Sequence, residues 1–319
     1  MKQKLKVAVI GSGTIGASWA LCFAWKGMDT TLFDIGQSQL AAARQNIESN
    51  LKVLEENHIL SKKEAAAIAE QIKMTIDLKE AVQDADFIQE CGPESYEIKW
   101  DILRQIEAYA DENTVIASST SGLFITEEAK YMQHPERLVG GHPYNPPHLL
   151  PLVEIVKGEK STETATQKAY DIYAALNKEP VIVQKEVSGF IANRIQVAVF
   201  REVIDLIQKG VCTMEDADKA MLYGPGLRWG LLGPMTVLHL GGGPGGIRAN
   251  MEKQRESYDI RLADMADWKH FPKDLAEMSA VGMEEELKHR PEEQGKSLEE
   301  ISKWRDEKLI ALLKMHGKL

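Results

Sequence analysis

The sequence has little of what marks several classes of protein. Its 319 residues include only three cysteines, Cys22, Cys91 and Cys212, which lie far apart. Their scarcity and spacing argue against a disulfide framework and against a cysteine-bound metal, so no metal site is expected. A reducing compartment fits this composition, and we expect a cytoplasmic protein. No apolar run approaches the roughly 18 residues that a membrane-spanning helix needs, so we expect no membrane association.

Positive charge is also scarce. The chain carries 38 Lys and Arg against 48 Asp and Glu, which gives a formal net charge of -10. A negative field of this size repels phosphates and argues against nucleic acid and anionic membranes as partners. An anionic substrate must then be held by local positive groups.

What the sequence does contain is an alternation of short apolar runs and helical patterns. Such an alternation is typical of an α/β fold, a Rossmann-type doubly wound sheet that is mostly parallel. The expected strands are 6–10, 30–33, 85–90, 114–118, 137–142, 152–156 and 180–183. Residues 37–73 predict two successive helices, inserted as a helical hairpin after the second strand. From residue 188 onward the patterns are helical. We therefore expect a Rossmann domain at 1–187 and an all-helical domain at 188–319.

A glycine fingerprint follows the first expected strand. In "VAVIGSGTIG" three glycines form G-x-G-x-x-G between a strand and a helix, the arrangement that binds the pyrophosphate of a dinucleotide at the helix N-terminus. A carboxylate ends the second strand, where it accepts hydrogen bonds from a ribose and repels a 2′-phosphate, so NAD is favoured over NADP. The cofactor-binding residues expected here are Gly11, Gly13, Thr14, Ile15, Gly16 and Asp34.

The stretch "GGHPYNPPHLLPLVE" contains the residues expected to do chemistry. His142 ends an apolar run, and Glu154 lies inside the next one. A buried carboxylate needs a partner, and a histidine held by a carboxylate is a suitable base for taking the proton of an alcohol during dehydrogenation. We therefore expect His142 and Glu154 to pair.

The order and spacing of six motifs resemble the 3-hydroxyacyl-CoA dehydrogenase superfamily over nearly the whole chain. These motifs are "IGSGTIG", "ECGPESYEIK", "ASSTSGL", "GHPYNPPHLLPLVE", "SGFIANR" and "GPGLRWGLLGP". The resemblance implies that His142 is the catalytic histidine and Glu154 its glutamate. It also implies that Ser121 and Asn193 bind the substrate, that Glu94 and Lys99 line the nicotinamide and ribose, and that the helical domain forms a homodimer.

Two departures from the usual pattern concern the substrate. The CoA-ester enzymes usually read S-N-T-S-S where this chain has "SSTSG" at 118–122, and as a rule they lack Arg228 of "GLRW". Both departures resemble the short-acid branch, typified by L-gulonate 3-dehydrogenase (lambda-crystallin) and L-carnitine dehydrogenase. The C-terminal "GKSLEEISKWRDEKL" resembles the carnitine enzymes most, whereas Asn193 belongs to the gulonate-type pattern, so the branch stays open. A guanidinium at Arg228 could bind a substrate carboxylate with two hydrogen bonds.

The sequence thus predicts an NAD-dependent dehydrogenase that oxidises the 3-hydroxyl of a small L-3-hydroxy acid, carnitine- or gulonate-like. One alternative is a 3-hydroxyacyl-CoA dehydrogenase with an acyl-CoA substrate. The five basic residues of the helical hairpin are offset by five glutamates, which makes it a poor site for CoA phosphates. A second alternative, of another class, is a non-catalytic NAD-binding or structural protein, against which the intact pair of His142 and Glu154 argues.

Overall fold

A computed structural model describes residues 4–319, so residues 1–3 of the expected first domain lie outside the described residues. The chain divides into two compact units, each described here by itself. The sheet unit consists of the chain up to Arg194 together with Ser302–Leu319, and the helical unit is Ile195–Ile301. The expected division at residue 187 differs from this at the C-terminal end, because the last residues of the chain belong to the sheet unit.

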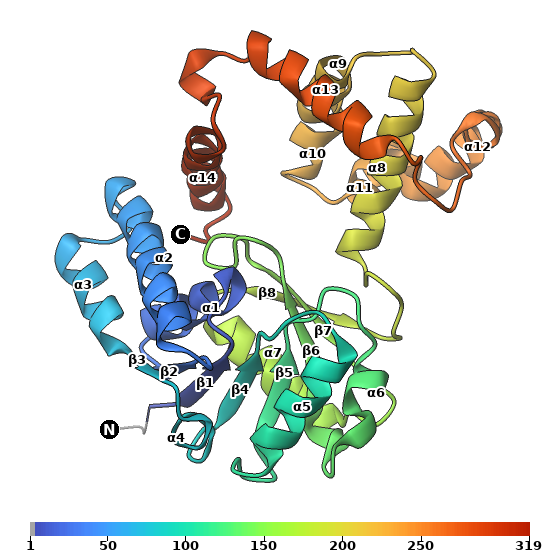
Figure 1. Ribbon diagram of the computed structural model, residues 1–319. Helices are drawn as coiled ribbons and strands as arrows, with labels where there is room; N and C mark the ends of the chain where they lie inside the picture. The colour runs from blue at the N-terminus through green and yellow to red at the C-terminus, as the bar shows by residue number, and fades with distance from the viewer. Residues whose placement is uncertain (1–3) are drawn as a thin grey trace. The chain divides into compact units, whose positions relative to one another are not determined.

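The sheet unit is built on eight strands in the order β3-β2-β1-β4-β5-β6-β7-β8 (Figure 1). Every neighbouring pair is parallel except β6 and β7, which are antiparallel. The strands are β1 (Lys6–Ile10), β2 (Asp29–Phe33), β3 (Ile72–Thr75), β4 (Phe87–Glu90), β5 (Val115–Ser118), β6 (Leu138–Pro143), β7 (Leu152–Val156) and β8 (Glu179–Val183). The mostly parallel Rossmann-type sheet is confirmed. Only β3 was not expected, because its residues were taken as the end of the helical hairpin.

Helices cover both faces of the sheet, and each face has its own apolar core. Along β1 the side chains alternate: Val7 and Val9 belong to one core, Ala8 and Ile10 to the other. This period of two is what a strand buried on both faces requires. The helices of this unit are α1 (Thr14–Trp25), α2 (Gln37–Glu56), α3 (Lys62–Gln71), α4 (Leu78–Val82), α5 (Tyr96–Glu107), α6 (Ile125–Glu128) and α7 (Glu163–Ala175). The expected hairpin is confirmed as α2 and α3.

The last helix, α14 (Leu298–Met315), returns the chain to the sheet unit (Figure 1). Ile310 and Leu313 are buried in the same apolar core as α1 and α2. Two contacts join α14 to the end of α2: Lys303 pairs with Glu56 at 3.3 Å, and Lys314 Nζ donates to the Asn57 carbonyl at 3.2 Å. The helical unit is therefore connected to the sheet unit at both of its ends.

The helical unit contains little buried apolar surface. Its helices are α8 (Ala192–Gln208, which begins in the sheet unit), α9 (Met214–Met221), α10 (Leu227–Trp229), α11 (Pro234–Gly241), α12 (Gly246–Asp264) and α13 (Leu275–His289). Thr213 caps α9, since the Asp216 backbone N–H donates to Thr213 Oγ1. Even within the long helix α8, Phe200 is 47% exposed. Across residues 4–319 no helix is long and apolar enough to cross a membrane.

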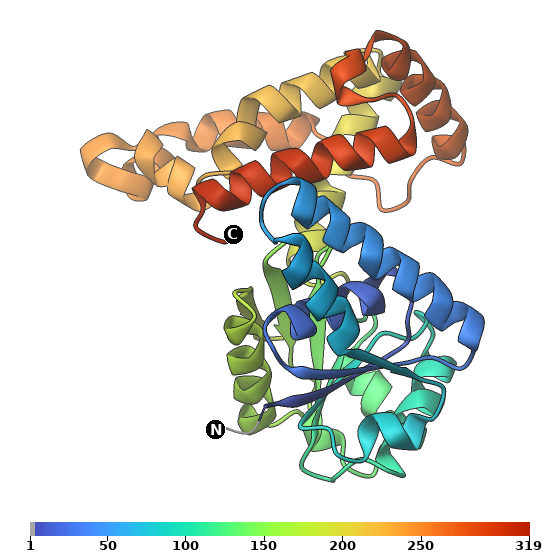
Figure 2. The same cartoon turned by 90° about the vertical axis from the view of Figure 1, so that its left-hand side faces the viewer.

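Figure 2 shows the sheet unit from the side, with the α2–α3 hairpin on one of its faces. The carboxyl ends of the parallel strands β1, β4, β5 and β6 share one edge of the sheet. In open α/β sheets ligands bind at this edge, where the strand order reverses, which here is between β1 and β4. The loops that leave these four strands therefore carry the candidate site.

Candidate active site

The loop between β1 and α1 has the shape that a dinucleotide requires. Gly11 has a φ of +99°, and a Cβ there would lie 2.6 Å from the Cys91 carbonyl oxygen after β4. A Cβ on Gly16 would lie 1.8 Å from the Gly11 carbonyl oxygen, so helix and loop touch at this point. Space is open at Gly13, where no atom lies within 4 Å of a Cβ position. Gly13 also caps α1 without a side-chain hydrogen bond, which leaves the first amides, at Thr14 and Ile15, for a pyrophosphate.

Asp34 lies beside this loop, directly after β2. Its Oδ2 accepts hydrogen bonds from the backbone N–H and the hydroxyl of Ser12, both at 2.7 Å. A carboxylate has about four acceptor positions, so lone pairs remain for ribose hydroxyls. The exposed Ile35 follows it, and neither Ile35 nor Gly36 could bind a 2′-phosphate. The residues present therefore fit NAD.

His142 and Glu154 face each other across the antiparallel pair β6–β7. His142 Nδ1 donates to Glu154 Oε2 at 2.9 Å, and both side chains are buried. Burial opposes ionisation of Glu154, but hydrogen bonds from His142 and from the Ala192 and Ile191 amides outweigh it and keep its pKa below the usual value. The expected pairing is present, and the Glu154 carboxylate holds the ring in the tautomer that leaves Nε2 available to accept a proton.

The first residues of α8 connect this pair to the loop after β5. Glu154 Oε1 accepts from the backbone N–H groups of Ile191 and Ala192 at 2.8 and 3.1 Å. The next residue, Asn193, donates from Nδ2 to the Ser121 carbonyl at 3.3 Å. Ile191, Ala192 and Asn193 thus link Glu154 to the Ser121 loop.

Glu94 organises the Ser121 loop. Its Oε1 accepts from Thr120 Oγ1, the Ser121 N–H and hydroxyl, and the Gly122 N–H, at 2.8 to 3.1 Å. Ser121 is exposed, so its hydroxyl can be reached from outside. Glu94 was expected to line the cofactor; its observed contacts position the serine loop that lies beside that site.

Lys99, also expected near the cofactor, is buried. Its Nζ donates to Glu90 Oε2 at 2.6 Å, and both side chains are at most 1% exposed. The structure therefore gives Lys99 contact with Glu90 and with the Gly92 carbonyl at 3.4 Å.

The second histidine of the proline-rich stretch, His148, has a structural environment. Its Nδ1 lies 3.4 Å from Ser18 Oγ of α1, and its ring is buried. Burial, with the nearby charges of Lys178 and Arg305, lowers the pKa of His148 to about 3, so the ring is neutral. Of the two histidines in this stretch, only His142 is paired with a carboxylate.

Arg228 lies in α10 of the helical unit, and its side chain is exposed. The guanidinium has no hydrogen bond or ion pair with any residue from 4 to 319. Tyr223 and Trp229, close to it in sequence, are also exposed, at 64% and 38%. A structural salt bridge therefore does not explain this arginine within the described chain. Within the same residues, no group of His, Cys, Asp or Glu is arranged to hold a metal ion.

This arrangement, a dinucleotide loop beside a buried histidine–glutamate pair, defines an NAD-dependent alcohol dehydrogenase of the Rossmann class. Sequence comparison specifies it further. The family described as 3-hydroxyacyl-CoA dehydrogenase, NAD binding domain, matches residues 6–187, and the C-terminal domain of the same family matches residues 189–280. The chain belongs to the 3-hydroxyacyl-CoA dehydrogenase family. The expected class, an NAD-dependent oxidoreductase acting on a CH–OH group, is confirmed.

The similarity to relatives extends over nearly the full chain. It is 38% identical to L-carnitine dehydrogenase from Oceanobacillus iheyensis over 308 residues, 97% of each chain. It is 42% identical to L-carnitine dehydrogenase from Nocardiopsis dassonvillei over 241 residues, 76% of this chain and 72% of the relative. Among solved structures, an NAD+-dependent dismutase, 5-formyl-3-hydroxy-2-methylpyridine 4-carboxylic acid 5-dehydrogenase, is similar with a TM-score of 0.81, 27% identity and 98% coverage of both chains. The (S)-3-hydroxybutyryl-CoA dehydrogenase from Ralstonia eutropha is similar with a TM-score of 0.69 and 26% identity, over 88% of this chain and 95% of that one.

Sequence reasoning missed the buried charges behind the Ser121 loop. Glu90 ends β4 with no exposed surface, and Glu128 ends α6 in the same condition. The sequence did contain one sign that Glu90 is buried, because Glu90 is the last residue of an apolar run, as His142 is. Glu128 gave no signal, since "ITEE" follows a turn and resembles an exposed helix start.

Proposed function

We propose that the protein oxidises the 3-hydroxyl of L-carnitine, or of a closely similar small L-3-hydroxy acid with a quaternary ammonium, in an NAD-dependent reaction. The observation that carries the proposal is the buried contact of 2.9 Å between His142 and Glu154, in a chain whose relatives at 34–42% identity include eight named L-carnitine dehydrogenase. An intact acid–base pair favours a working enzyme over a non-catalytic NAD-binding protein.

In this proposal His142 is the base. Glu154 accepts the Nδ1 proton and so keeps Nε2 free for the proton of the substrate hydroxyl. As the C3–O bond becomes a carbonyl, that proton moves to Nε2, and the carboxylate of Glu154 stabilises the imidazolium. In the reverse direction the imidazolium returns the proton to the carbonyl oxygen. NAD, when bound, supplies the acceptor for the hydride from C3.

Ser121 and Asn193 are proposed to hold the reacting oxygen. The exposed Ser121 hydroxyl can turn from Glu94 to the substrate, while Glu94 keeps its contacts with the Ser121 and Gly122 amides. Asn193 keeps this loop beside the histidine–glutamate pair through its contact with the Ser121 carbonyl. The hydroxyl is thereby oriented before the proton leaves, which removes an entropic part of the barrier.

Arg228 is proposed as the anchor for the substrate carboxylate. A planar guanidinium without another partner can bind a carboxylate with two parallel hydrogen bonds. The exposed rings of Tyr223 and Trp229 supply aromatic faces that attract a trimethylammonium group. A CoA thioester has no charge at the carbon where the acid has its carboxylate, so it would gain little from Arg228.

A substrate panel tests the proposal. The protein is mixed with NAD and, in separate wells, L-carnitine, D-carnitine, L-gulonate, 3-hydroxybutyrate or 3-hydroxybutyryl-CoA, and the absorbance of reduced cofactor is followed. We expect turnover with L-carnitine. Because 3-hydroxybutyrate differs by lacking the quaternary ammonium, its rate measures the contribution of that group. Turnover of the CoA ester alone would refute the short-acid proposal. No reduced cofactor in any well would favour a non-catalytic NAD-binding protein.

We further propose a cytoplasmic homodimer that assembles through the helical unit. The support is the exposed apolar surface of that unit, which includes Phe200 at 47%, Leu222 at 52% and Leu231 at 57%. Apolar surface on this scale is typical of an interface. Light scattering after size-exclusion chromatography checks the mass. Phe200→Asp should shift it toward a monomer, whereas a dimer that tolerates this charge would argue for a different interface.

A further inference from the structure

A buried charged cluster lies behind the Ser121 loop and takes no part in the proposed reaction. Glu90 is its centre. Its Oε2 accepts from Lys99 Nζ at 2.6 Å and from Ser118 Oγ at 2.9 Å, and its Oε1 accepts from the Gly92 N–H at 2.6 Å. Glu90 thus ties the end of β5 to the loop after β4. These are the two segments that lead to Ser121 and border the dinucleotide loop.

Glu128 completes the cluster from α6, the short helix that follows the Ser121 loop. Its side chain has no exposed surface, and neither carboxyl oxygen has a hydrogen-bond partner among residues 4–319. Glu107 offers a contrast, since it is also buried but is paired with Arg137 at 3.5 Å and accepts two backbone amides. An ionised carboxylate needs partners of that kind, and Glu128 does not have them.

The charges that face Glu128 do not balance. Lys99 faces it from α5, Glu90 from β4 and Glu94 from the loop between them. The one ammonium is already engaged by Glu90. Burial raises the pKa of Glu128 to about 8, and the carboxylates of Glu90 and Glu94 add to this effect. The charge of Lys99 and the nearby Ser118 hydroxyl oppose it and do not cancel it.

We infer that Glu128 carries a proton at neutral pH and is a positioning residue for the Ser121 loop, and that loss of this proton sets the alkaline limit of the reaction. The second clause rests on the proposed function, and the first does not. When Glu128 ionises, two carboxylates compete for Lys99. Glu90 then holds Ser118 and Gly92 less firmly, and the Ser118 hydroxyl is the acceptor for the Thr120 N–H beside Ser121.

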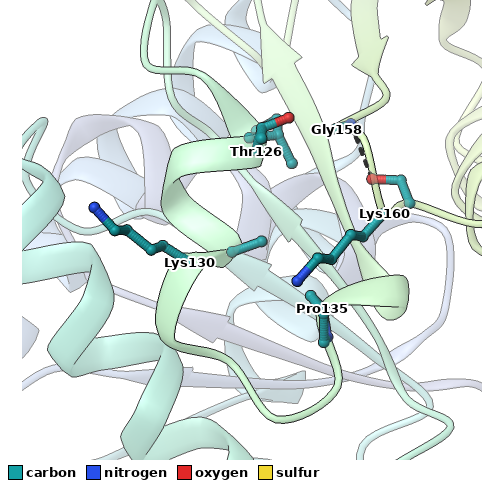
Figure 3. A pocket seen from close by; sticks show the side chains of 8 residues that line it. Thr126, Lys130, Pro135, Gly158 and Lys160 are labelled. Atoms are coloured by element: carbon teal, nitrogen blue, oxygen red, sulfur yellow. Dashed lines mark hydrogen bonds between the residues drawn. The ribbon is translucent and has the colours of Figure 1, made fainter.

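The neighbouring glutamate supplies a matched control. Glu127 is exposed and lies 3.8 Å from Lys130, at the surface. Lys130 borders a small surface pocket with Thr126, Pro135 and Lys160, shown in Figure 3, where its side chain points away from the other labelled residues. Glu127→Gln removes a carboxylate from the same helix without touching the buried cluster.

Two measurements test the inference without a substrate. Infrared spectra of the native protein and of Glu128→Gln at neutral pH should differ by the carbonyl stretch of one protonated carboxylic acid. Hydrogen exchange of the 119–124 segment, corrected for intrinsic rates, should lose protection at least several-fold between about pH 7 and pH 9.5 in the native protein and in Glu127→Gln. In Glu128→Gln protection should stay constant, because an amide cannot ionise.

The kinetic arm follows the oxidation direction, in which His142 must be unprotonated and activity rises to a plateau with pH. Above the ionisation of Glu128, kcat/KM of the native enzyme should fall by about tenfold per pH unit, as a single essential proton requires. Glu128→Gln should extend the plateau. If Glu128→Gln does not fold, Glu128→Leu replaces it, since a buried apolar side chain is also uncharged.

Each outcome decides a different claim. Absence of the infrared band means that Glu128 is ionised and overturns the inference. A band without any change in loop protection or in the pH profile overturns the positioning role. If L-carnitine gives no turnover, the proposed function fails, while the infrared and exchange results still decide whether Glu128 holds the proton and the loop.

Discussion

The two units of this chain differ in what they bury. In the sheet unit, β1, β4, β5 and β6 are almost wholly inaccessible, and the unit also buries the charged pairs Glu90–Lys99 and Glu154–His142. In the helical unit the buried apolar side chains are Ala217 and Ala266, and large residues such as Phe200, Leu231 and Ile260 are exposed. The difference teaches that the sheet unit carries its own apolar cores, whereas the helical unit leaves its large apolar side chains exposed, as the proposed dimer would require.

In the proposed function, the cofactor and the proton are handled by residues of the sheet unit alone. The glycine loop, Asp34, the His142–Glu154 pair and the Ser121 loop all lie before Arg194. The helical unit contains Arg228, whose guanidinium has no hydrogen bond or ion pair within residues 4–319, and exposed aromatic rings. Substitutions in the sheet unit should therefore affect catalysis or cofactor binding. Substitution of Arg228 in the helical unit should affect binding of the acid substrate. Of the four predictions that follow, the first three test this division.

The largest effect is expected for His142→Gln in the sheet unit. General acid–base catalysis contributes about 10²–10⁴-fold, so kcat should fall at least about a hundredfold. NAD affinity should stay near normal, because the glycine loop is untouched. Steady-state kinetics and a cofactor titration measure the two quantities. Full activity in this variant would remove His142 from the mechanism, and Glu154→Gln, which still orients the ring, should lose a similar amount or less.

Next comes Arg228→Met in the helical unit. If the bound substrate buries the pair that it forms with Arg228, truncating one partner costs about 2–5 kcal/mol, so KM for the acid should rise roughly thirtyfold or more. Cofactor affinity should hardly change, and Arg228→Lys should recover only part of the loss. Initial rates over a range of acid concentrations measure the effect. An unchanged KM for a proven acid substrate would contradict the assignment and break the proposed division between the units.

A smaller change is expected for Asp34→Ala, again in the sheet unit. Loss of a charged hydrogen bond to the ribose should weaken NAD binding by about tenfold. Discrimination against NADP should relax, because the carboxylate no longer repels a 2′-phosphate. KM for the acid should stay constant, in contrast to Arg228→Met. Titrations with both cofactors check this, and a native protein that prefers NADP would refute the role of Asp34.

The smallest effect, over one pH unit, concerns the stability of the sheet core. The pKa of Glu128 is raised from 4.5 to about 8, so the unfolded chain loses this proton at lower pH than the folded one. The stabilising contribution of the protonated form is complete below about pH 4.5 and is lost as the pH rises toward 8, by about 1.4 kcal/mol per pH unit. Denaturant unfolding at pH 6 and 7 should show this decline in the native protein and not in Glu128→Gln. Parallel declines in both would place the titration elsewhere.

Local patterns in the sequence were sufficient to predict the strands other than β3 and the pairing of His142 with Glu154. Strands buried on both faces must be short apolar runs, and the turn after β1 needs glycine at Gly11, so both could be recognised without coordinates. The His142–Glu154 pair was predictable because the two residues lie in consecutive strands, and a buried carboxylate requires a partner. The branch of the family rested on a few positions, of which Arg228 was one.

Long-range packing decided the rest. β3 became a strand because β2 offered it an edge, although its residues continue a helical pattern. Ser302–Leu319 joined the sheet unit because Ile310 and Leu313 fill its core. Glu128 is buried because α6 places it beside a lysine already held by Glu90. The sequence by itself determined the strands other than β3, the glycine loop and the pairing of His142 with Glu154, since these depend on neighbouring residues. Only the tertiary structure decided which charges share a dry interior, because burial and pairing depend on segments that the chain brings together from far apart.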